Sequence, residues 1–292
     1  YRPIMSKDSK IGIFDSGLGG LTVFKSIKKI LPYESFIYVG DLAHLPYGDK
    51  SKESIIKYSK RIVDFFITKE VDIIVVACNS ASSVALGALQ TLYPNLPIIG
   101  TIEPSVQQAM ALKDHHNIGI IGTETTINSN AYNIMFDDYL KYCAPFFLKS
   151  CEIYSIPCPL FVPIVEEGWE NTDIAHQVAT KYLGKFNNIK LDTIILACTH
   201  YPMLIDTLKS VFKNLSHTNL NFVDSGNAIS KYFQHQEMNT YDKLKYLSPK
   251  NDGGHLIHQN DEFYVTDTSY QFDKLAKRFL GVELSNIQLI SL

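Results

Sequence analysis

The chain has 292 residues, enough for two domains, and its 46% hydrophobic and 20% charged residues are those of an ordinary soluble globular protein. A net charge of −3 gives no electrostatic attraction for nucleic acid or an anionic membrane, so neither is expected as a partner. No apolar run approaches the roughly 20 residues that span a bilayer.

Cysteine usage indicates a reducing compartment. The odd count of five, without a CxxC pair or zinc-site spacing, argues against a disulfide framework and against a metal site. Residues 1–10 are polar and lack the apolar centre of a signal peptide, so we expect a tail there. A cytoplasmic protein without a bound metal is predicted.

Strands and helices alternate along the first hundred residues. We predict strands at residues 10–14, 35–40, 71–78 and 96–100, and helices at residues 21–30 and 52–70, with a further helix after residue 80. Residues 41–51 form a loop with the turn sequence Pro46-Tyr47-Gly48. This βαβαβ order predicts a doubly wound parallel sheet.

The pattern restarts after residue 104. Helices are predicted at residues 105–112, 128–140 and 174–186, strands at 117–122, 151–156 and 191–198, and a loop at 157–169. A helix opened by Pro202 follows. A strand at 219–223 is expected to return to the first domain, followed by a polar insertion at 236–254, a strand at 262–266, a helix at 269–279 and a closing strand at 282–289.

One ten-residue stretch occurs twice. Residues 71–80 (VDIIVVACNS) align without a gap to residues 191–200 (LDTIILACTH), 120 positions further on. The identical pairs are Asp72/Asp192, Ile74/Ile194, Ala77/Ala197 and Cys78/Cys198. Each copy is an apolar run followed by a helix, which is typical of a buried parallel strand, and its cysteine ends the strand where α/β sheets bind ligands. We therefore expect two similar domains that present two thiols to one cleft.

Two thiols on opposite sides of one carbon can invert its configuration. A thiolate removes a proton from one face, and a thiol returns one to the other face. A free thiol has a pKa near ~8.5, and a helix N-terminus and the imidazole of His200 are expected to lower it. A redox disulfide would favour cysteines close in sequence, and a Cys–His hydrolase would leave one of the matched thiols unexplained.

The glycine-rich turn at residues 15–20 (DSGLGG) matches neither GxGxxG nor a P-loop, so dinucleotide binding is not expected. Asp15, at the end of its strand, is a candidate carboxylate in the cleft.

The chain resembles the cofactor-independent glutamate racemases of the aspartate/glutamate racemase superfamily over residues 11–226. The motifs that carry the resemblance are FDSGLGGLTV (14–23), PYG (46–48), ACNSAS (77–82), IEP (102–104), GTETTI (122–127), FVPIVEEG (161–168) and ACTHYP (197–202). The resemblance implies an α/β fold of two pseudo-symmetric doubly wound parallel-sheet domains with the active site in the cleft between them. Residues 11–103 plus 222–292 would form the first domain and residues 104–221 the second.

The resemblance also implies roles for individual residues. Cys78 matches the base for D-glutamate and Cys198 the base for L-glutamate, while Asp15, His200 and either Glu166 or its neighbour Glu167 would assist the thiols. The matched substrate-binding residues are Asp15, Ser16, Pro46, Tyr47, Gly48, Asn79, Ser80, Thr123, Thr126, Thr199 and His200. No PLP, metal or other cofactor is implied, and the expected role is supply of D-glutamate for peptidoglycan. We also expect a homodimer.

Three positions qualify the resemblance. Ser80 stands where Thr is commoner but keeps the hydroxyl, and Ser105 stands where many members have Gly, which bears on the local hinge geometry. His200 favours glutamate, because aspartate racemases tend to carry Glu at this position. The alternatives are a racemase for aspartate or another small dicarboxylate, and a catalytically silent amino-acid-binding protein.

Overall fold

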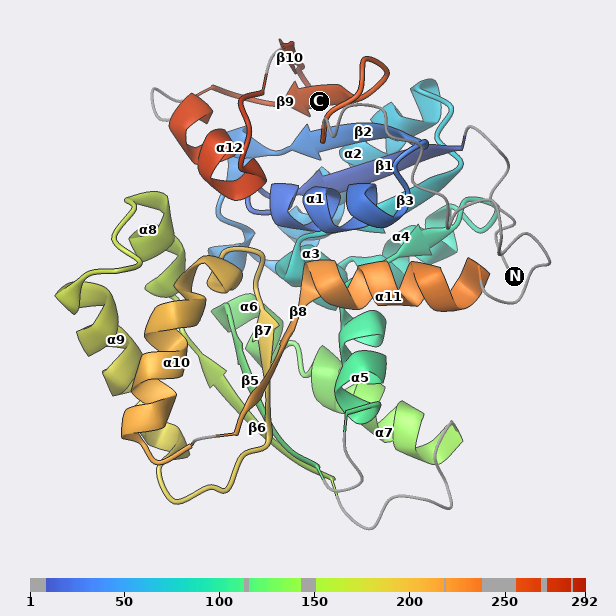
Figure 1. Cartoon of the computed structure of the whole chain (residues 1–292). Helices are drawn as coiled ribbons and strands as arrows, with labels where there is room; N and C mark the ends of the chain where they lie inside the picture. The colour runs from blue at the N-terminus through green and yellow to red at the C-terminus, as the bar shows by residue number, and fades with distance from the viewer. Residues whose placement is uncertain are drawn as a thin grey trace.

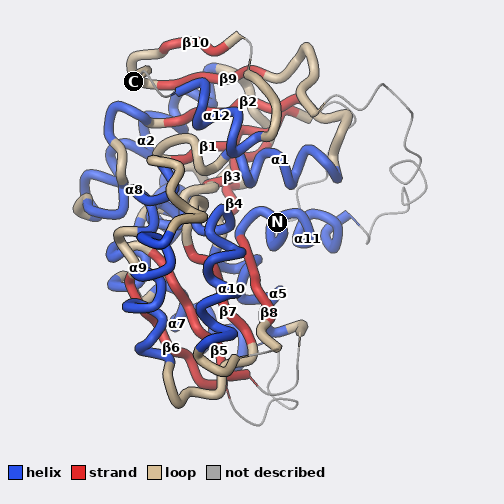
Figure 2. The backbone as a smooth tube through the Cα atoms, turned by 60° about the vertical axis from the view of Figure 1, so that its left-hand side comes forward, coloured by secondary structure: helices blue, strands red, loops and turns tan. Residues whose placement is uncertain are grey.

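The strands form two separate parallel sheets, which lie one above the other in both views of the molecule (Figures 1 and 2). The computed structural model describes residues 9–112, 116–142, 151–217, 219–237, 256–268, 272–284 and 286–292. We refer to the six-stranded sheet as the first sheet and to the four-stranded sheet as the second sheet. The predicted α/β class with two parallel sheets is confirmed.

The first sheet has the strand order β10-β9-β2-β1-β3-β4, and every neighbouring pair is parallel. Its strands are β1 (Lys10–Asp15), β2 (Ser35–Gly40), β3 (Ile73–Val76), β4 (Ile98–Ile99), β9 (Glu262–Val265) and β10 (Ile287–Leu289). The beginning and the end of the chain therefore share one sheet.

The second sheet has the order β6-β5-β7-β8, again parallel throughout. Its strands are β5 (His116–Gly122), β6 (Cys151–Pro157), β7 (Thr193–Ala197) and β8 (Asn221–Asp224). All residues of β3 and β7 are buried, as expected for strands covered by helices on both faces.

Helices cover both sheets. They are α1 (Leu21–Ile30), α2 (Lys52–Thr68), α3 (Asn79–Val84), α4 (Leu86–Leu92), α5 (Ile102–Met110), α6 (Glu124–Asn128), α7 (Ala131–Tyr142), α8 (Phe161–Glu166), α9 (Asp173–Leu183), α10 (Ile205–Asn214), α11 (Ser225–Glu237) and α12 (Phe272–Leu280). Short 3₁₀ turns are η1 (Leu42–His44), η2 (Tyr47–Asp49), η3 (Gly184–Phe186) and η4 (Tyr201–Leu204). Helix α11 packs against both α1 and α5, between the two sheets (Figure 1). None of the described helices is long and apolar enough to cross a membrane.

The repeated aspartate, Asp72 in one copy and Asp192 in the other, accepts an equivalent backbone hydrogen bond in each sheet. The Oδ2 atom of Asp72 accepts a hydrogen bond from the backbone N–H of Lys10 at 2.8 Å, beside the start of β1. Asp192 accepts from the backbone N–H of Asn117 in β5 at 2.9 Å. In each sheet, this contact ties the cysteine strand to its central neighbour at the end opposite the thiol.

Two sequence predictions about the fold are wrong. The strand at 219–223 was expected in the first sheet, but β8 pairs with β7 in the second sheet, and the chain rejoins the first sheet only at β9. Residues 157–169 were expected to be a loop, but they contain α8, in which Pro163 lies in the first turn, where its missing N–H has no intrahelical partner to lose.

Smaller differences concern element ends. The helix expected at 105–112 begins earlier, at Ile102, and the Ser105 hydroxyl donates to the Thr101 carbonyl at 2.7 Å within it. The closing strand covers only Ile287–Leu289. The expected 1–10 tail and the polar segment 236–254 lie almost wholly outside the described residues, as does Cys143.

Candidate active site

The two repeated cysteines follow β3 in the first sheet and β7 in the second sheet, and both line one cavity. Cys78 follows β3 and directly precedes α3, and Cys198 follows β7; both side chains are buried. The cavity is lined by Ser16, Gly17, Leu45, Pro46, Tyr47, Gly48, Cys78, Asn79, Ser80, Thr123, Val162, Glu166, Cys198, Thr199 and His200. Its walls therefore come from both sheets, as the sequence repeat predicts.

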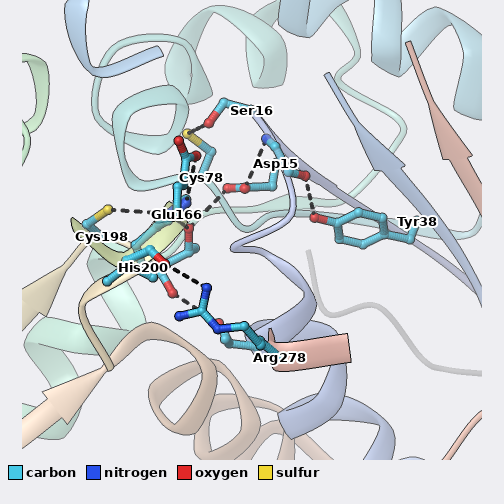
Figure 3. A network of polar contacts seen from close by, with 12 residues as sticks. Asp15, Ser16, Tyr38, Cys78, Glu166, Cys198, His200 and Arg278 are labelled. Atoms are coloured by element: carbon cyan, nitrogen blue, oxygen red, sulfur yellow. Dashed lines mark hydrogen bonds and ion pairs between the residues drawn. The ribbon is translucent and has the colours of Figure 1, made fainter. Parts of the chain in front are cut away.

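A histidine and a carboxylate stand next to Cys198. The Nδ1 atom of His200 lies 4.0 Å from the Cys198 sulfur, and its Nε2 atom lies 3.3 Å from Oε1 of Glu166 at the end of α8 (Figure 3). Burial opposes the charged form of His200, but its hydrogen bonds to Cys198 and Glu166 outweigh burial and raise its pKa to about 10. His200 is therefore a cation at neutral pH. Glu167, the other carboxylate considered from the sequence, is exposed.

An acidic and a hydroxyl side chain stand on the side of Cys78 instead. The Cys78 thiol donates to the Ser16 hydroxyl at 3.7 Å, and Asp15 lies beside it at the end of β1 (Figure 3). Burial and the nearby charge of Asp15 raise the pKa of Cys78 to about 12, the reverse of the lowering expected from the sequence. Burial also raises the pKa of Asp15, against the opposing effects of His200 and of the Gly20 and Gly17 amides. Cys78 is a protonated thiol at neutral pH.

The two sheets meet at the glycine-rich turn. The Thr199 hydroxyl donates to Oδ1 of Asp15 at 3.5 Å, and the Thr22 hydroxyl donates to the Thr199 carbonyl at 3.4 Å. A Cβ atom on Gly19 would lie 2.4 Å from Oγ1 of Thr199 and 2.7 Å from Nδ1 of His200. The glycine is therefore required by this close approach and not by a bound phosphate.

Three hydroxyl groups form a cluster across the same interface. Ser80 of α3 shares a hydrogen bond of 2.9 Å with Thr123 and lies 3.5 Å from Thr126, and the Thr126 hydroxyl accepts from Thr123 at 3.0 Å. Thr123 also caps α6 by accepting from the Thr126 amide at 3.3 Å. A Cβ on Gly48 would lie 3.0 Å from Thr123, so a glycine is favoured here too. Such hydroxyls are suitable donors to a substrate carboxylate.

Two predicted substrate-binding side chains have other partners. The Tyr47 hydroxyl donates to Asp41 at 2.5 Å, and Asp41 also accepts from Thr266 at 2.8 Å. The Asn79 side-chain amide accepts from Thr101 at 2.9 Å and donates to Ser225 at 3.0 Å. These hydrogen bonds fix the positions of both side chains in the cavity wall.

The structure brings the sequence-predicted residues together, with two of them set back. Asp15 and Thr126 are not among the lining residues and contact the lining through Thr199 and Ser80. Gly17, Leu45 and Val162 line the cavity and were not selected from the sequence, although Gly17 lies inside the FDSGLGGLTV motif and Val162 inside the FVPIVEEG motif. Phe279 of α12 was also missed; its ring packs edge-on against His200 with centroids 5.2 Å apart.

Comparison with known proteins decides the family. A family model described as Asp/Glu/Hydantoin racemase matches residues 11–231. The chain belongs to the Asp/Glu/hydantoin racemase family. The predictions of the family and of an isomerase are thereby confirmed. Among the described residues of this racemase-family chain, no group of three or more His, Cys, Asp or Glu side chains is arranged to hold a metal ion.

The relatives span almost the whole chain. The glutamate racemase of Sulfurihydrogenibium sp. is 39% identical over 284 residues, which cover 97% of this chain and 98% of the relative. The glutamate racemase of Aquifex aeolicus is 41% identical over 275 residues, covering 94% and 95%. The crystal structure of the Francisella tularensis glutamate racemase in complex with D-glutamate has a TM-score of 0.80 and 33% identity over 98% of both chains.

Proposed function

We propose that this protein is a glutamate racemase that interconverts L- and D-glutamate by two-base proton transfer between Cys78 and Cys198, without PLP, metal or another cofactor. The observation that carries the proposal is the meeting of two strand-end thiols in one cavity, with the imidazole of His200 beside one thiol and the carboxyl group of Asp15 near the other. The curated glutamate racemases among its relatives support glutamate as the substrate.

The charges suggest which thiol starts each direction. In the direction from L-glutamate, Cys198 acts as a thiolate that removes the α-proton, because the His200 cation 4.0 Å away stabilises negative charge on its sulfur. Cys78 is protonated and gives its proton to the opposite face of the α-carbon. The reaction leaves a thiol at Cys198 and a thiolate at Cys78, and the direction from D-glutamate is the reverse.

An amino-acid α-proton is much less acidic than a thiol, so proton transfer alone is insufficient. A positioned acid and base supply about 10²–10⁴-fold. The remainder is assigned to hydrogen bonds that strengthen as negative charge moves onto the α-carboxylate. In this proposal the hydroxyls of Ser80, Thr123 and Thr199 and the backbone amides of the cavity wall provide these bonds, in a cavity formed only when the two sheets meet.

The cellular assignments rest on the resemblance. We propose that the enzyme supplies D-glutamate for peptidoglycan synthesis in the cytoplasm. The homodimer and the division into residues 11–103 plus 222–292 and 104–221 stay predictions. The pairing of β8 with β7 supports a second boundary a few residues later.

The test is proton NMR of L-glutamate and D-glutamate, each incubated with the protein in D₂O without added cofactor. We expect the α-proton signal of both enantiomers to disappear and the circular dichroism of either solution to decay to zero. Exchange of aspartate but not glutamate would overturn the substrate assignment. Binding of glutamate without exchange of any α-proton would overturn the racemase proposal in favour of a binding protein.

A further inference from the structure

Helix α12 belongs to the first sheet in sequence, between β9 and β10, but two of its neighbouring residues reach the Cys198 side of the cavity. Phe279 packs against the His200 ring. Arg278 contacts the segment that carries Glu166 and is half-buried there, with its side chain 20% exposed. Figure 1 shows α12 above α8, and Figure 3 shows the Arg278 guanidinium directed toward the His200 side of the network.

The Arg278 guanidinium holds that segment at two points. Its Nη1 atom donates to the Val165 carbonyl at 2.9 Å, and its Nη2 atom donates to both carboxylate oxygens of Glu170 at 2.6 and 2.7 Å. Val165 is the next-to-last residue of α8, and its carbonyl also accepts the Gly168 amide at 3.0 Å, so the guanidinium is a second donor to this helix end. A cation at a helix C-terminus hydrogen-bonds the last carbonyls and interacts favourably with the helix dipole.

Glu166 lies between these two contacts in sequence. The Glu166 side chain is one-third exposed, so packing alone does little to fix its position. Its 3.3 Å contact with His200 directs the carboxylate into the site. The planar guanidinium contacts the carbonyl of the residue before Glu166 and the carboxylate of Glu170, four residues after it. A lysine ammonium group has no planar fork of N–H donors and so does not hold both groups in a fixed geometry.

We propose that Arg278 is a positioning residue for proton transfer at Cys198. It fixes the end of α8 so that Glu166 reaches His200, and Glu166 in turn orients the imidazolium beside the Cys198 sulfur. This inference rests on the proposed two-thiol function, because it assigns Arg278 to one of the two proton-transfer steps. Arg278 itself does not line the cavity and is not a catalytic residue.

The experiment measures racemisation rates and primary isotope effects with [2-²H]-L-glutamate and [2-²H]-D-glutamate. For Arg278→Gln we expect roughly 10-fold slower racemisation, part of the ~10²–10⁴-fold that positioned acid–base groups supply. Slower transfer at Cys198 makes that step more rate-limiting. The isotope effect on kcat/KM should therefore rise with L-glutamate, whose proton Cys198 removes, and fall with D-glutamate.

Two further variants make the result specific. Lys277→Gln removes the neighbouring cation of α12, whose ammonium pairs with Glu283 at the surface, and should leave rates and isotope effects at wild-type values. Arg278→Lys keeps the charge in a protein that retains its fold, and should shift both isotope effects in the same directions as Arg278→Gln but by less.

The outcomes separate the two proposals. A loss of rate with unchanged isotope effects in both Arg278 variants would mean that Arg278 only stabilises the fold, and this would overturn the positioning role while leaving the racemase proposal intact. Shifts of equal size in Lys277→Gln would overturn it as well. A wild-type protein that exchanges no α-proton from either enantiomer would instead overturn the proposed function itself.

Discussion

Cys78 and Cys198 occupy equivalent backbone positions at the ends of two equivalent strands, yet one has an acidic neighbour and the other a basic one. Beside Cys78 lies the carboxyl group of Asp15, and the pKa of the thiol is raised to about 12. Beside Cys198 lies His200, whose pKa of about 10 makes it a cation at neutral pH. The repeat thus supplies two thiols, while His200, which stands opposite Ser80 in the alignment of the copies, and Asp15, which lies outside both copies, give each thiol its own acid–base character. Three experiments would test this difference, in decreasing order of expected effect.

Removing either thiol should have the largest effect on racemisation. Cys78→Ala and Cys198→Ala are each expected to slow racemisation by at least about 10³-fold, because either change removes one of the two proton-transfer groups. Cys78→Ala should still exchange the α-proton of L-glutamate slowly in D₂O, and Cys198→Ala that of D-glutamate, as followed by proton NMR. Cys151→Ala on β6, away from the cavity lining, is the control and should keep normal activity. Near-normal turnover without either strand-end thiol would refute the two-base mechanism.

Separating the glycine-rich turn from Thr199 and His200 should slow racemisation less than removing a thiol. Gly19→Ala puts a methyl group within 2.4 Å of the Thr199 hydroxyl and 2.7 Å of the His200 ring. We expect kcat to fall by about 10²-fold, since small displacements of positioned groups cost rates of this size. Gly87→Ala in α4, where the new methyl meets no atom within 4 Å, should behave as wild type. Equal kcat values for the two alanine variants would show that this close approach is not needed.

The charge on His200 can be measured directly. In the free wild-type protein, the ¹³Cε1 resonance of His200 should titrate with a midpoint near pH 10, and His200→Asn identifies the resonance by its loss. Glu166→Gln removes one of the groups that raise this pKa, so the midpoint should move down. With a raised pKa in the folded state, His200 contributes stability below its unfolded pKa near 6.5 and loses that contribution as pH rises through about 10. A wild-type midpoint near 6.5 would contradict the assigned charge.

The sequence predicted the parts of the molecule that depend on local pattern. Buried parallel strands are continuous apolar runs, so the ends of β3 and β7, and with them Cys78 and Cys198, could be placed from the sequence. Strand β8 was assigned to the wrong sheet, because its four residues are mostly half-buried and their composition fits either sheet equally well. Helix α8 was missed because it is short and contains Pro163.

Contacts between residues far apart in the chain could not be predicted from the sequence. Arg278 lies 112 positions after Glu166, and nothing in its local pattern separates it from the surface cation Lys277 one residue earlier. The side chains of Tyr47 and Asn79 likewise lie within recognised motifs, but only the fold shows that Asp41 and Ser225 engage them. The thiol pKa was also misjudged, because burial of Cys78 outweighs its hydrogen bonds.

The return of the chain to its starting sheet has a consequence for synthesis on the ribosome. The second sheet is made from one continuous stretch, β5 to β8, whereas the first sheet needs β9 and β10 from the last thirty-odd residues to complete its edge. A nascent chain that has passed α11 already contains both cysteines, but neither Phe279 nor Arg278 has yet been translated. Because domains fold as units during elongation, we expect the Cys198 strand to be in place before Phe279 packs against its histidine and before Arg278 binds the end of α8.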